Sequence, residues 1–276
     1  MEQLRNSLTL YAYNILGSYE EAKDVVQDVY LRMAQVQQDT VRDQKNYMIR
    51  MVINLAIDQK RKQQRLREAY PGQWLPEPIA TESPESSLHR KEILSYSIMV
   101  LLEKLDPKQR AVFILKEAFD YDHDEIASVL GITVENSRKI LSRAKEELKT
   151  SVSTQHKVQR ELVLQYMNVL ERNDVKALEK LLNEQILVVS DGGGKATAFM
   201  NPVQGIKSVV ALLQGLFKKA YHQAESRFGW VNHQPALFYY HEGKLMTVQI
   251  FTIENEQFAN IFYIRNPEKM NSIKKD

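Results

Sequence analysis

Polar and basic side chains recur between Thr133 and Arg143, and their chemistry suits nucleic acid. Guanidinium and amide groups bond base edges in the major groove of DNA, and ammonium and hydroxyl groups bond its phosphates. Leu141, Ala144 and Leu148 fall on one apolar stripe, so the polar residues project elsewhere. Taken alone, the stretch also fits an ordinary helical hairpin with a solvated charged face. The candidate DNA-binding residues here are Thr133, Glu135, Asn136, Arg138, Lys139, Ser142 and Arg143.

Two helices joined by a tight turn are predicted to position this polar row. Ile126, Ala127 and Leu130 repeat at helical spacing, and Gly131 follows them where a left-handed backbone costs little. Thr133 is placed to cap the second helix. The pattern predicts a helix-turn-helix, in which the second helix lies in the major groove.

A second candidate for nucleic-acid binding is a long helix predicted from about Asn46. Asn54, Asp58 and Arg61 line one side of it at helical spacing, and the helix then turns basic. Cations at this end would contact phosphates, while Asn54 and the neighbouring loop would hold unstacked bases. A solvated basic face is the alternative. The basic residues are Lys60, Arg61, Lys62, Arg65 and Arg67.

An acidic helical face precedes this helix. The predicted helix from Tyr19 has a buried apolar stripe, which leaves Asp24, Gln27, Asp28 and Leu31 toward solvent or a partner. A face with acidic groups and one exposed leucine suits a protein contact better than DNA. An acidic first turn favoured by the helix dipole is the alternative.

Length and composition predict a soluble protein of several domains. The chain has 276 residues, a formal net charge of +2 and no cysteine. Two or three compact units are expected at this length, and the lack of cysteine excludes disulfides and thiolate zinc sites and fits a reducing cytoplasm. We find no apolar run long enough to span a bilayer and no secretory signal pattern at the start. We therefore expect a cytoplasmic protein with no membrane partner.

Residues 68–90 are predicted to be a linker because prolines, glycine and serines interrupt every periodicity. Within it, Trp74-Leu75-Pro76-Glu77-Pro78 places two apolar side chains in a segment stiffened by prolines. Exposed apolar groups gain free energy only by docking, so the segment is predicted to dock on another surface. A tryptophan folded back on its own domain is the alternative.

Residues 91–150 are predicted to form a helical unit, and residues 155–276 a unit of mixed class. In the first, an apolar helix begins at Ile93 and ends near Pro107. The second begins with helices and continues with antiparallel strands, so it is predicted to be an α+β domain. Its predicted strands are Ile186–Val189, Lys195–Phe199, Arg227–Val231, Ala236–Tyr240, Leu245–Ile253 and Phe258–Arg265.

The order of the helical motifs resembles the extracytoplasmic-function class of bacterial RNA polymerase sigma factors. The motifs are DVVQDVYLRM, NYMIRMVINLAIDQKRKQQR and the helix-turn-helix. The resemblance implies two all-α domains, residues 1–67 engaging the melted minus-ten promoter element and residues 91–150 reading the minus-thirty-five element. Ser137 and Ile140 depart from the family pattern, which commonly has a buried valine and a basic residue there; Ser137 is expected to loosen packing.

The same resemblance implies core RNA polymerase and promoter DNA as partners. By resemblance, the residues that bind the polymerase are Asp24, Gln27, Asp28 and Leu31. It also implies that the melted minus-ten element is contacted by the loop at residues 37–44 and by the helix that carries Asn54, Arg61, Lys62 and Arg65.

The carboxyl-terminal residues resemble a SnoaL-like cone domain that is fused to one subclass of these sigma factors. That subclass shares a WLPEP-type linker, a DGGGK-type turn and a late NPxKL-type segment, in which this chain has Met270 for leucine. A flexible hairpin turn is the alternative for DGGGK. The regulatory contact residues implied by these motifs are Trp74, Leu75, Pro76, Glu77, Pro78, Asp191, Gly192, Gly193, Gly194, Lys195, Asn266 and Pro267.

The linker is predicted to dock near the glycine-rich turn. Residues 192–194 lack side chains, so a backbone or an indole ring can approach, and Asp191 and Lys195 can supply polar contacts. Docking would fix the relative placement of the two DNA-reading domains and so regulate transcription in cis. The sequence does not give the sign of this effect.

The same sequence is also compatible with two other functions. One is a helix-turn-helix regulator that acts without polymerase and senses a small ligand, whose identity the sequence leaves unknown. The other is an enzyme of the SnoaL-like fold. His222, His233 and His241 lack metal-ligand spacing and a neighbouring carboxylate, so we predict no catalytic residue, metal or cofactor.

Overall fold

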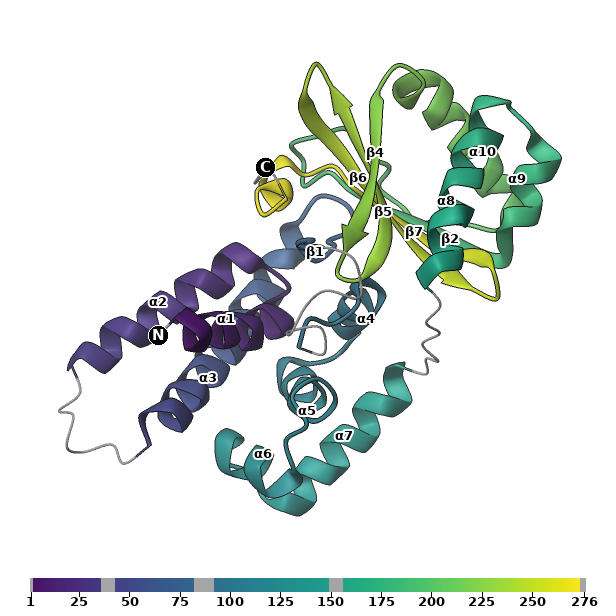
Figure 1. The fold of residues 1–276 in the computed structure, drawn as a ribbon. Coiled ribbons are helices and arrows are strands. Elements are labelled where there is room, and N and C mark those ends of the chain that lie inside the picture. Colours follow the sequence, from purple (N-terminus) through teal and green to yellow (C-terminus); the bar gives the residue numbers. More distant parts are fainter. Residues whose placement is uncertain (1, 36–42, 82–91, 149–155, 274–276) are drawn as a thin grey trace. The chain divides into compact units, whose positions relative to one another are not determined.

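The computed structural model shows two compact units (Figure 1). Unit 1 comprises Met1–Glu68 and Leu88–Thr150, and unit 2 comprises Ala69–Ser87 and Ser151–Asp276. The segment from Ala69, which the sequence places in a linker, thus belongs to the same unit as the carboxyl-terminal domain. The residues that the structure describes are 2–35, 43–81, 92–148 and 156–273.

Unit 1 begins with three helices that pack on one another. They are α1 (Glu2–Leu16), α2 (Tyr19–Gln35) and α3 (Gln44–Leu66). Gly17 ends α1 with a positive φ of 76°, a conformation that glycine adopts at little cost. Asp43 caps α3, because its side chain accepts a hydrogen bond from the Asn46 amide at 3.0 Å.

The second half of unit 1 contains the predicted helix-turn-helix. Its elements are α4 (Tyr96–Leu101), the 3-10 turn η3 (Leu102–Lys104), α5 (Pro107–Glu117), α6 (His123–Leu130) and α7 (Val134–Leu148). Capping boxes at Asp106 and Asp122 start α5 and α6. The helix predicted from Ile93 starts only at Tyr96, because Ser95 before it has an extended backbone.

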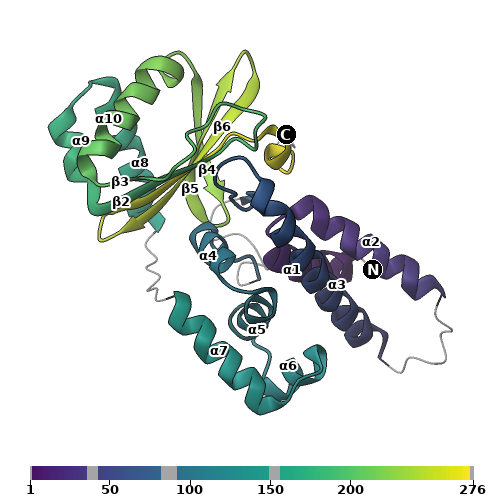
Figure 2. The ribbon, with the colours of Figure 1, turned by 180° about the vertical axis from the view of Figure 1, so that it is seen from behind.

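Unit 2 is an α+β domain built on one sheet. The strand order is β1-β4-β5-β6-β7-β2-β3. Three helices lie together on one side of the sheet (Figures 1 and 2), namely α8 (His156–Glu171), α9 (Val175–Leu181) and α10 (Ile206–Leu216), which the π-helical turn η4 (Phe217–Tyr221) extends. The strands are β1 (Ala80–Thr81), β2 (Leu182–Asp191), β3 (Val203–Gln204), β4 (Glu225–Val231), β5 (Gln234–His241), β6 (Lys244–Glu254) and β7 (Gln257–Ile264).

Tight hairpins connect strands β4 to β7. Each turn has two residues with positive φ, as type I′ turns require: Asn232-His233, Glu242-Gly243 and Asn255-Glu256. Two expectations about the sheet were wrong. β2 pairs with β7 in parallel, and Lys195–Phe199 is not a strand because the chain turns back on itself there, with the Ala196 amide donating to the Gly192 carbonyl at 3.0 Å.

Four buried polar side chains bond one another within the mainly apolar core of unit 2. The buried amide of Gln249 donates to the hydroxyls of Tyr166 at 2.9 Å and Tyr263 at 2.8 Å, and it accepts from Tyr239 at 3.0 Å. Burial raises the pKa of Tyr239 and Tyr263 well above the ordinary value. The network satisfies these buried groups internally.

Candidate nucleic-acid interface and linker site

Helix α2 presents the predicted polymerase-binding face to solvent. Asp24, Gln27 and Asp28 are exposed, and Leu31 is 58% exposed although it is a large apolar residue. The valines on the other side of the helix are buried in the core of the three-helix bundle. This exposure leaves the four residues accessible for the protein contact that the sequence predicted.

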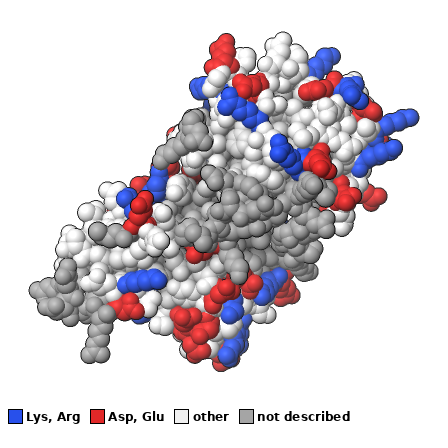
Figure 3. Space-filling view, viewed as in Figure 1, with Lys and Arg blue, Asp and Glu red and all other residues white. Residues whose placement is uncertain are grey.

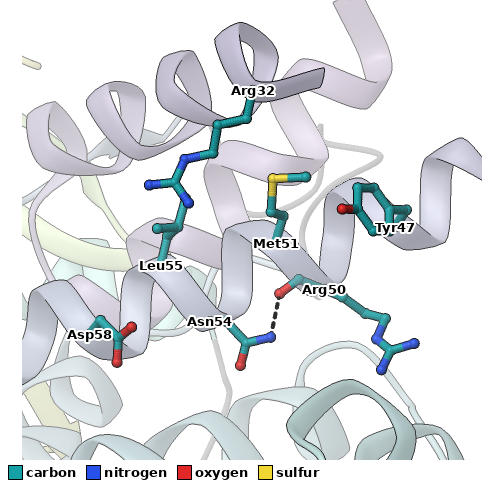
Figure 4. Close-up of a pocket in the computed structure, with 7 residues that line it drawn as sticks. All are labelled: Arg32, Tyr47, Arg50, Met51, Asn54, Leu55 and Asp58. Atoms are coloured by element: carbon teal, nitrogen blue, oxygen red, sulfur yellow. Dashed lines mark hydrogen bonds between the residues drawn. The ribbon is translucent and has the colours of Figure 1, made fainter. Parts of the chain in front are cut away.

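A pocket of about 430 Å³ lies beside helix α3 (Figure 4). In this view Arg32 reaches in from α2, whereas Arg50 and Asn54 point away from α2. The Asn54 side chain donates to the Arg50 carbonyl at 2.9 Å and to the Val129 carbonyl at 3.5 Å. The pocket is lined by Arg32, Tyr47, Arg50, Met51, Asn54, Leu55 and Asp58.

The pocket combines the groups that hold an unstacked base. Tyr47 is 42% exposed and offers an aromatic face, Asn54 offers an amide, and Arg32 and Arg50 offer guanidinium groups. Of these lining residues, the sequence singled out Asn54 but not Tyr47, Arg32 or Arg50. Residues 37–42 of the predicted minus-ten loop lie outside the described residues.

The basic end of α3 divides between two faces. Arg61, Lys62 and Arg65 are exposed, as phosphate contacts require, and Arg61 pairs with Asp58 at 2.9 Å. Lys60 is fully buried and Arg67 largely so, and both bond Glu103. The assignment of these two residues to a nucleic-acid surface was wrong. The reason is helical spacing: Lys60 follows Ala56 by four residues and Ile53 by seven, so it lies on the buried face.

The helix-turn-helix has the predicted caps. Gly131 takes the left-handed conformation with a φ of 62° at the end of α6, and the Thr133 hydroxyl accepts from the Asn136 amide at 3.1 Å. Over α6 and α7 acidic and basic side chains lie side by side (Figure 3), for example in the pair of Lys139 with Glu135 at 2.7 Å. The exposed residues of α7 include Glu135, Asn136, Arg138, Lys139, Ser142 and Arg143.

The two departures from the family pattern have different surroundings. Ser137 is fully buried, and its hydroxyl lies 2.9 Å from His123 Nδ1 at the start of α6. This hydrogen bond offsets the packing that a larger apolar side chain would supply. Ile140 is half-buried, and its side chain has no group that could donate a hydrogen bond to DNA as a basic residue would.

In unit 2 the linker bonds to the carboxylate of Asp191. The Tyr70 hydroxyl donates to Oδ1 at 2.6 Å, and the Leu75 amide donates to Oδ2 at 2.9 Å. Lys269 Nζ also lies 2.6 Å from Oδ2 and donates to the Leu75 carbonyl. The Asp191 side chain is fully buried. Residues separated by more than a hundred positions are thus joined at one buried charge.

Lys269 also lies over two aromatic rings of the linker. Its Nζ is 4.0 Å from the centroid of the Trp74 ring and 5.2 Å from that of Tyr70. These distances are within the range of cation–π attraction, which strengthens when the cation loses water. We call Tyr70, Trp74, Leu75, Asp191 and Lys269 the Asp191 cluster.

The glycine-rich turn allows the linker to approach closely. A Cβ on Gly193 would lie 2.2 Å from the Asn266 amide nitrogen and 3.0 Å from the Tyr70 hydroxyl, and one on Gly194 would lie 2.8 Å from Pro71. Both glycines have positive φ. Side chains at these two positions would therefore push the linker away.

Other predicted contact residues lie around the cluster. Pro76, Glu77 and Pro78 are buried, and the Ser272 hydroxyl donates to the Pro78 carbonyl at 2.7 Å. The Asn266 side chain donates to the Tyr70 hydroxyl at 3.2 Å, and Pro267 begins the 3-10 turn η5 (Pro267–Met270). Lys195 pairs with Glu268 on the surface, rather than with the linker.

Sequence reasoning missed Tyr70 and Lys269. Lys269 occupies the fourth position of the late motif NPEKM, so the motif itself was a usable signal. Tyr70 sits beside Pro71 at the start of the linker and carries no comparable pattern.

Comparisons with known proteins agree with this architecture. Residues 1–66 match the sigma-70 region 2 family, and residues 95–148 match the sigma-70 region 4 family. The chain is 30% identical to the ECF RNA polymerase sigma factor SigJ of Mycobacterium tuberculosis over 227 residues, which are 79% of this chain and 72% of that protein. This chain is an extracytoplasmic-function sigma factor. The sigma factor is also 29% identical to SigW of Bacillus subtilis over 154 residues, which cover 50% of this chain and 78% of SigW.

The three-domain architecture is shared as well. The crystal structure of the Mycobacterium tuberculosis sigma factor SigJ matches 98% of this sigma factor and 97% of its own chain, with a TM-score of 0.80 and 25% identity. Two helical domains followed by an α+β cone domain were predicted from the sequence, and this prediction is confirmed. Among the helices that the structure describes, none has both the length and the apolar character that a membrane crossing requires.

Proposed function

We propose that this sigma factor directs core RNA polymerase to specific promoters and that its carboxyl-terminal domain regulates this activity in cis. Membership of the sigma-factor family supports the first part of this proposal, the direction of polymerase to promoters. The observation that supports the second is the Asp191 cluster, in which the carboxyl-terminal domain binds the segment that immediately follows α3. A protein that acts on promoters with polymerase works in the cytoplasm.

The α3 pocket is proposed to hold a base of the melted minus-ten strand. Unstacked bases gain free energy by stacking on an aromatic ring, and an amide can bond the exposed edge of the base. Tyr47 and Asn54 offer these two groups, and Arg61, Lys62 and Arg65 continue the surface toward phosphates.

Helix α7 is proposed to read the minus-thirty-five element. Arg138 and Arg143 are exposed, and an arginine that bonds a guanine bidentately contributes roughly 1–3 kcal/mol to sequence discrimination. Asp24, Gln27, Asp28 and Leu31 on α2 are proposed to bind the polymerase, since their face is exposed and acidic.

An enzymatic role has little support from the cone domain. The buried side chains of Gln249, Tyr166, Tyr239 and Tyr263 bond one another within its core. Within the described residues, no group of three or more His, Asp or Glu side chains is placed to hold a metal ion. We propose a regulatory role for this domain because its Asp191 cluster holds the linker.

Run-off transcription tests the proposal. Purified core polymerase and the full chain should initiate at a subset of a promoter library. Trp74→Ala and Asp191→Ala should each change the yield from these promoters, and the double variant should deviate from additivity by about 0.5–3 kcal/mol, because the two residues share Lys269. Glu268→Gln, which alters a surface ion pair beside the cluster, is the matched control.

Two outcomes would contradict the proposal in different ways. Specific promoter binding that needs no core polymerase would contradict the proposal that this chain acts by directing polymerase. Strictly additive effects of the Trp74 and Asp191 substitutions would leave promoter recognition intact and overturn regulation through the cluster.

A further inference from the structure

Two buried polar atoms at one end of the unit 2 sheet have no hydrogen-bond partner among the described residues. They are the hydroxyl oxygen of Ser190 on β2 and Nε of Arg265, the residue that follows β7. Ser190 is only 2% exposed. Buried polar groups in folded proteins are almost always bonded, because an unbonded one costs free energy. Two such atoms together therefore indicate a partner from outside the chain.

The strand register places these two residues next to each other. Ser190 lies opposite Tyr263 in the parallel pair of β2 and β7, and Arg265 is two residues beyond Tyr263. Side chains alternate between the faces of a strand, so all three belong to the face whose core packs under α8, α9 and α10. Diagonal neighbours of this kind have Cα atoms about 8 Å apart, a distance that a long side chain spans.

Arg265 has a neutral partner but no counterion in the part of the chain that the structure describes. Its Nη1 donates to the carbonyl of Thr197, and the residue is partly buried. A guanidinium that loses water without gaining a negative charge is unfavourable. A water molecule would supply an acceptor but no charge. The partner that compensates Arg265 fully is an anion.

Tyr221 brings a further hydroxyl to the same end of the sheet. Its ring lies 6.1 Å from that of Tyr263, and its hydroxyl lies 3.3 Å from that of Thr247 on β6. Whichever of these two hydroxyls donates to the other, one O–H of the pair remains available. Burial raises the pKa of Tyr221, and the positive charge of Arg265 opposes this rise, so the guanidinium lies near the phenol.

We propose that Ser190, Tyr221 and Arg265 form a binding site for the carboxylate group of a small molecule. The two oxygens of a carboxylate accept several hydrogen bonds, and those from a guanidinium are among the strongest. The donors here are the Arg265 Nε–H and the hydroxyls. Phe199, whose ring lies 6.3 Å from that of Tyr263, offers an apolar contact for the rest of the molecule.

The same strand ends hold the linker through their opposite face. Ser190 is followed by Asp191, and Arg265 is followed by Asn266. Asp191 and Asn266 both bond the hydroxyl of Tyr70 in the linker. A ligand that moves Ser190 or Arg265 would therefore displace the residues that hold the linker. This regulatory meaning rests on the proposed function, whereas the binding site itself does not.

Nuclear magnetic resonance of the isotope-labelled full chain tests the site, because the Nε–H signal of an arginine is observable and responds to its acceptor. The signal of Arg265 is identified by its absence from Arg265→Gln. The probe is acetate, which is small enough to occupy a carboxylate site whatever the rest of the natural ligand is. Acetate should shift the Arg265 signal to saturation, with a dissociation constant on the order of millimolar for so few atoms. Acetamide has the same shape without the charge and should cause no saturating shift.

Arg227 is the matched control within the same spectrum. Its Nε already donates to Glu225 at 2.7 Å, so its signal should not respond to acetate. Ser190→Ala removes one donor and keeps a small side chain, so it should weaken acetate binding several-fold when the Arg265 signal is followed. Arg227→Gln should bind acetate as the parent does.

The outcomes separate this site from the proposed function. An Arg265 signal that stays unchanged in acetate well above millimolar, or that responds equally to acetate and to chloride, would overturn the carboxylate site. Unweakened binding in Ser190→Ala would overturn the site as built from these residues. Acetate binding by a chain that does not support initiation would keep the site and refute the proposed function.

Discussion

Two buried carboxylates, Glu103 in unit 1 and Asp191 in unit 2, join distant segments in different ways. Glu103 accepts hydrogen bonds from three cations, Lys60, Arg67 and Arg110, and these four residues form the Glu103 cluster. Asp191 is bonded by one cation, one phenol and one backbone amide. The first cluster carries more positive than negative charge, whereas the charges of the second balance.

This difference in charge predicts that substitutions will affect the stability of the two clusters differently. Glu103 pairs with three cations at once, so removal of its charge breaks three ion pairs, two of them with fully buried cations. The Asp191 carboxylate accepts hydrogen bonds from donors of three kinds, so the cluster does not depend on any one of these bonds alone. We expect the first to respond mainly to charge and the second mainly to geometry, and the following predictions test that contrast in order of expected size.

The largest effect is expected from Glu103→Gln. It should lower the free energy of unfolding of unit 1 by about 3–5 kcal/mol, since breaking a buried ion pair leaves a charge unpaired. Urea denaturation followed by far-UV circular dichroism measures the loss. Trp74 and Trp230 both lie in unit 2, so tryptophan fluorescence reports whether unit 2 is unchanged.

A companion variant sharpens this prediction. Replacing three members together, as Lys60→Met, Glu103→Leu and Arg110→Met, should recover most of the stability, because apolar side chains of similar size carry no desolvation cost. A triple variant as unstable as Glu103→Gln would show that shape, rather than charge, governs this cluster. Glu117→Gln, which breaks a partly exposed ion pair with Lys145, should differ from the parent by less than about 1 kcal/mol.

A smaller effect is expected from Asp191→Asn. The substitution keeps one acceptor but removes the charge that faces Lys269, and it should cost unit 2 about 1–3 kcal/mol. The emission of Trp74 should change as its ring separates from Lys269, since they are 4.0 Å apart in the intact cluster. A loss as large as that of Glu103→Gln would contradict the contrast between the clusters.

The smallest effect concerns acid. The pKa of Glu103 is lowered in the folded state, so its stabilisation is present above the unfolded pKa of about 4.3 and is lost as the pH falls toward the folded value. Below pH 4.3 the parent should lose up to about 1.4 kcal/mol per pH unit more than Glu103→Gln. Denaturation series at several acidic pH values measure this slope. Equal slopes in the parent and in Glu103→Gln would show that the pKa of Glu103 is not lowered in the folded state.

Local sequence determined the helices, their caps and the class of each domain. Gly131, Thr133 and the capping boxes act within a few residues, so spacing and residue type suffice to predict them. The exposed faces of α2 and α7 followed from periodicity for the same reason. The DGGGK turn was also predictable from the sequence, because consecutive glycines allow another part of the chain to approach the backbone closely.

The tertiary structure decided which partners meet. Helical spacing puts Lys60 on the apolar face of α3 and Lys62 off it, but the partner that Lys60 meets there, Glu103, follows from the packing of distant segments in the bundle. Tyr70 and Lys269 meet at Asp191 only because β2 and β7 lie side by side and end near the returning linker. Contacts between residues far apart in the chain depend on the fold as a whole, so spacing within one segment does not specify them.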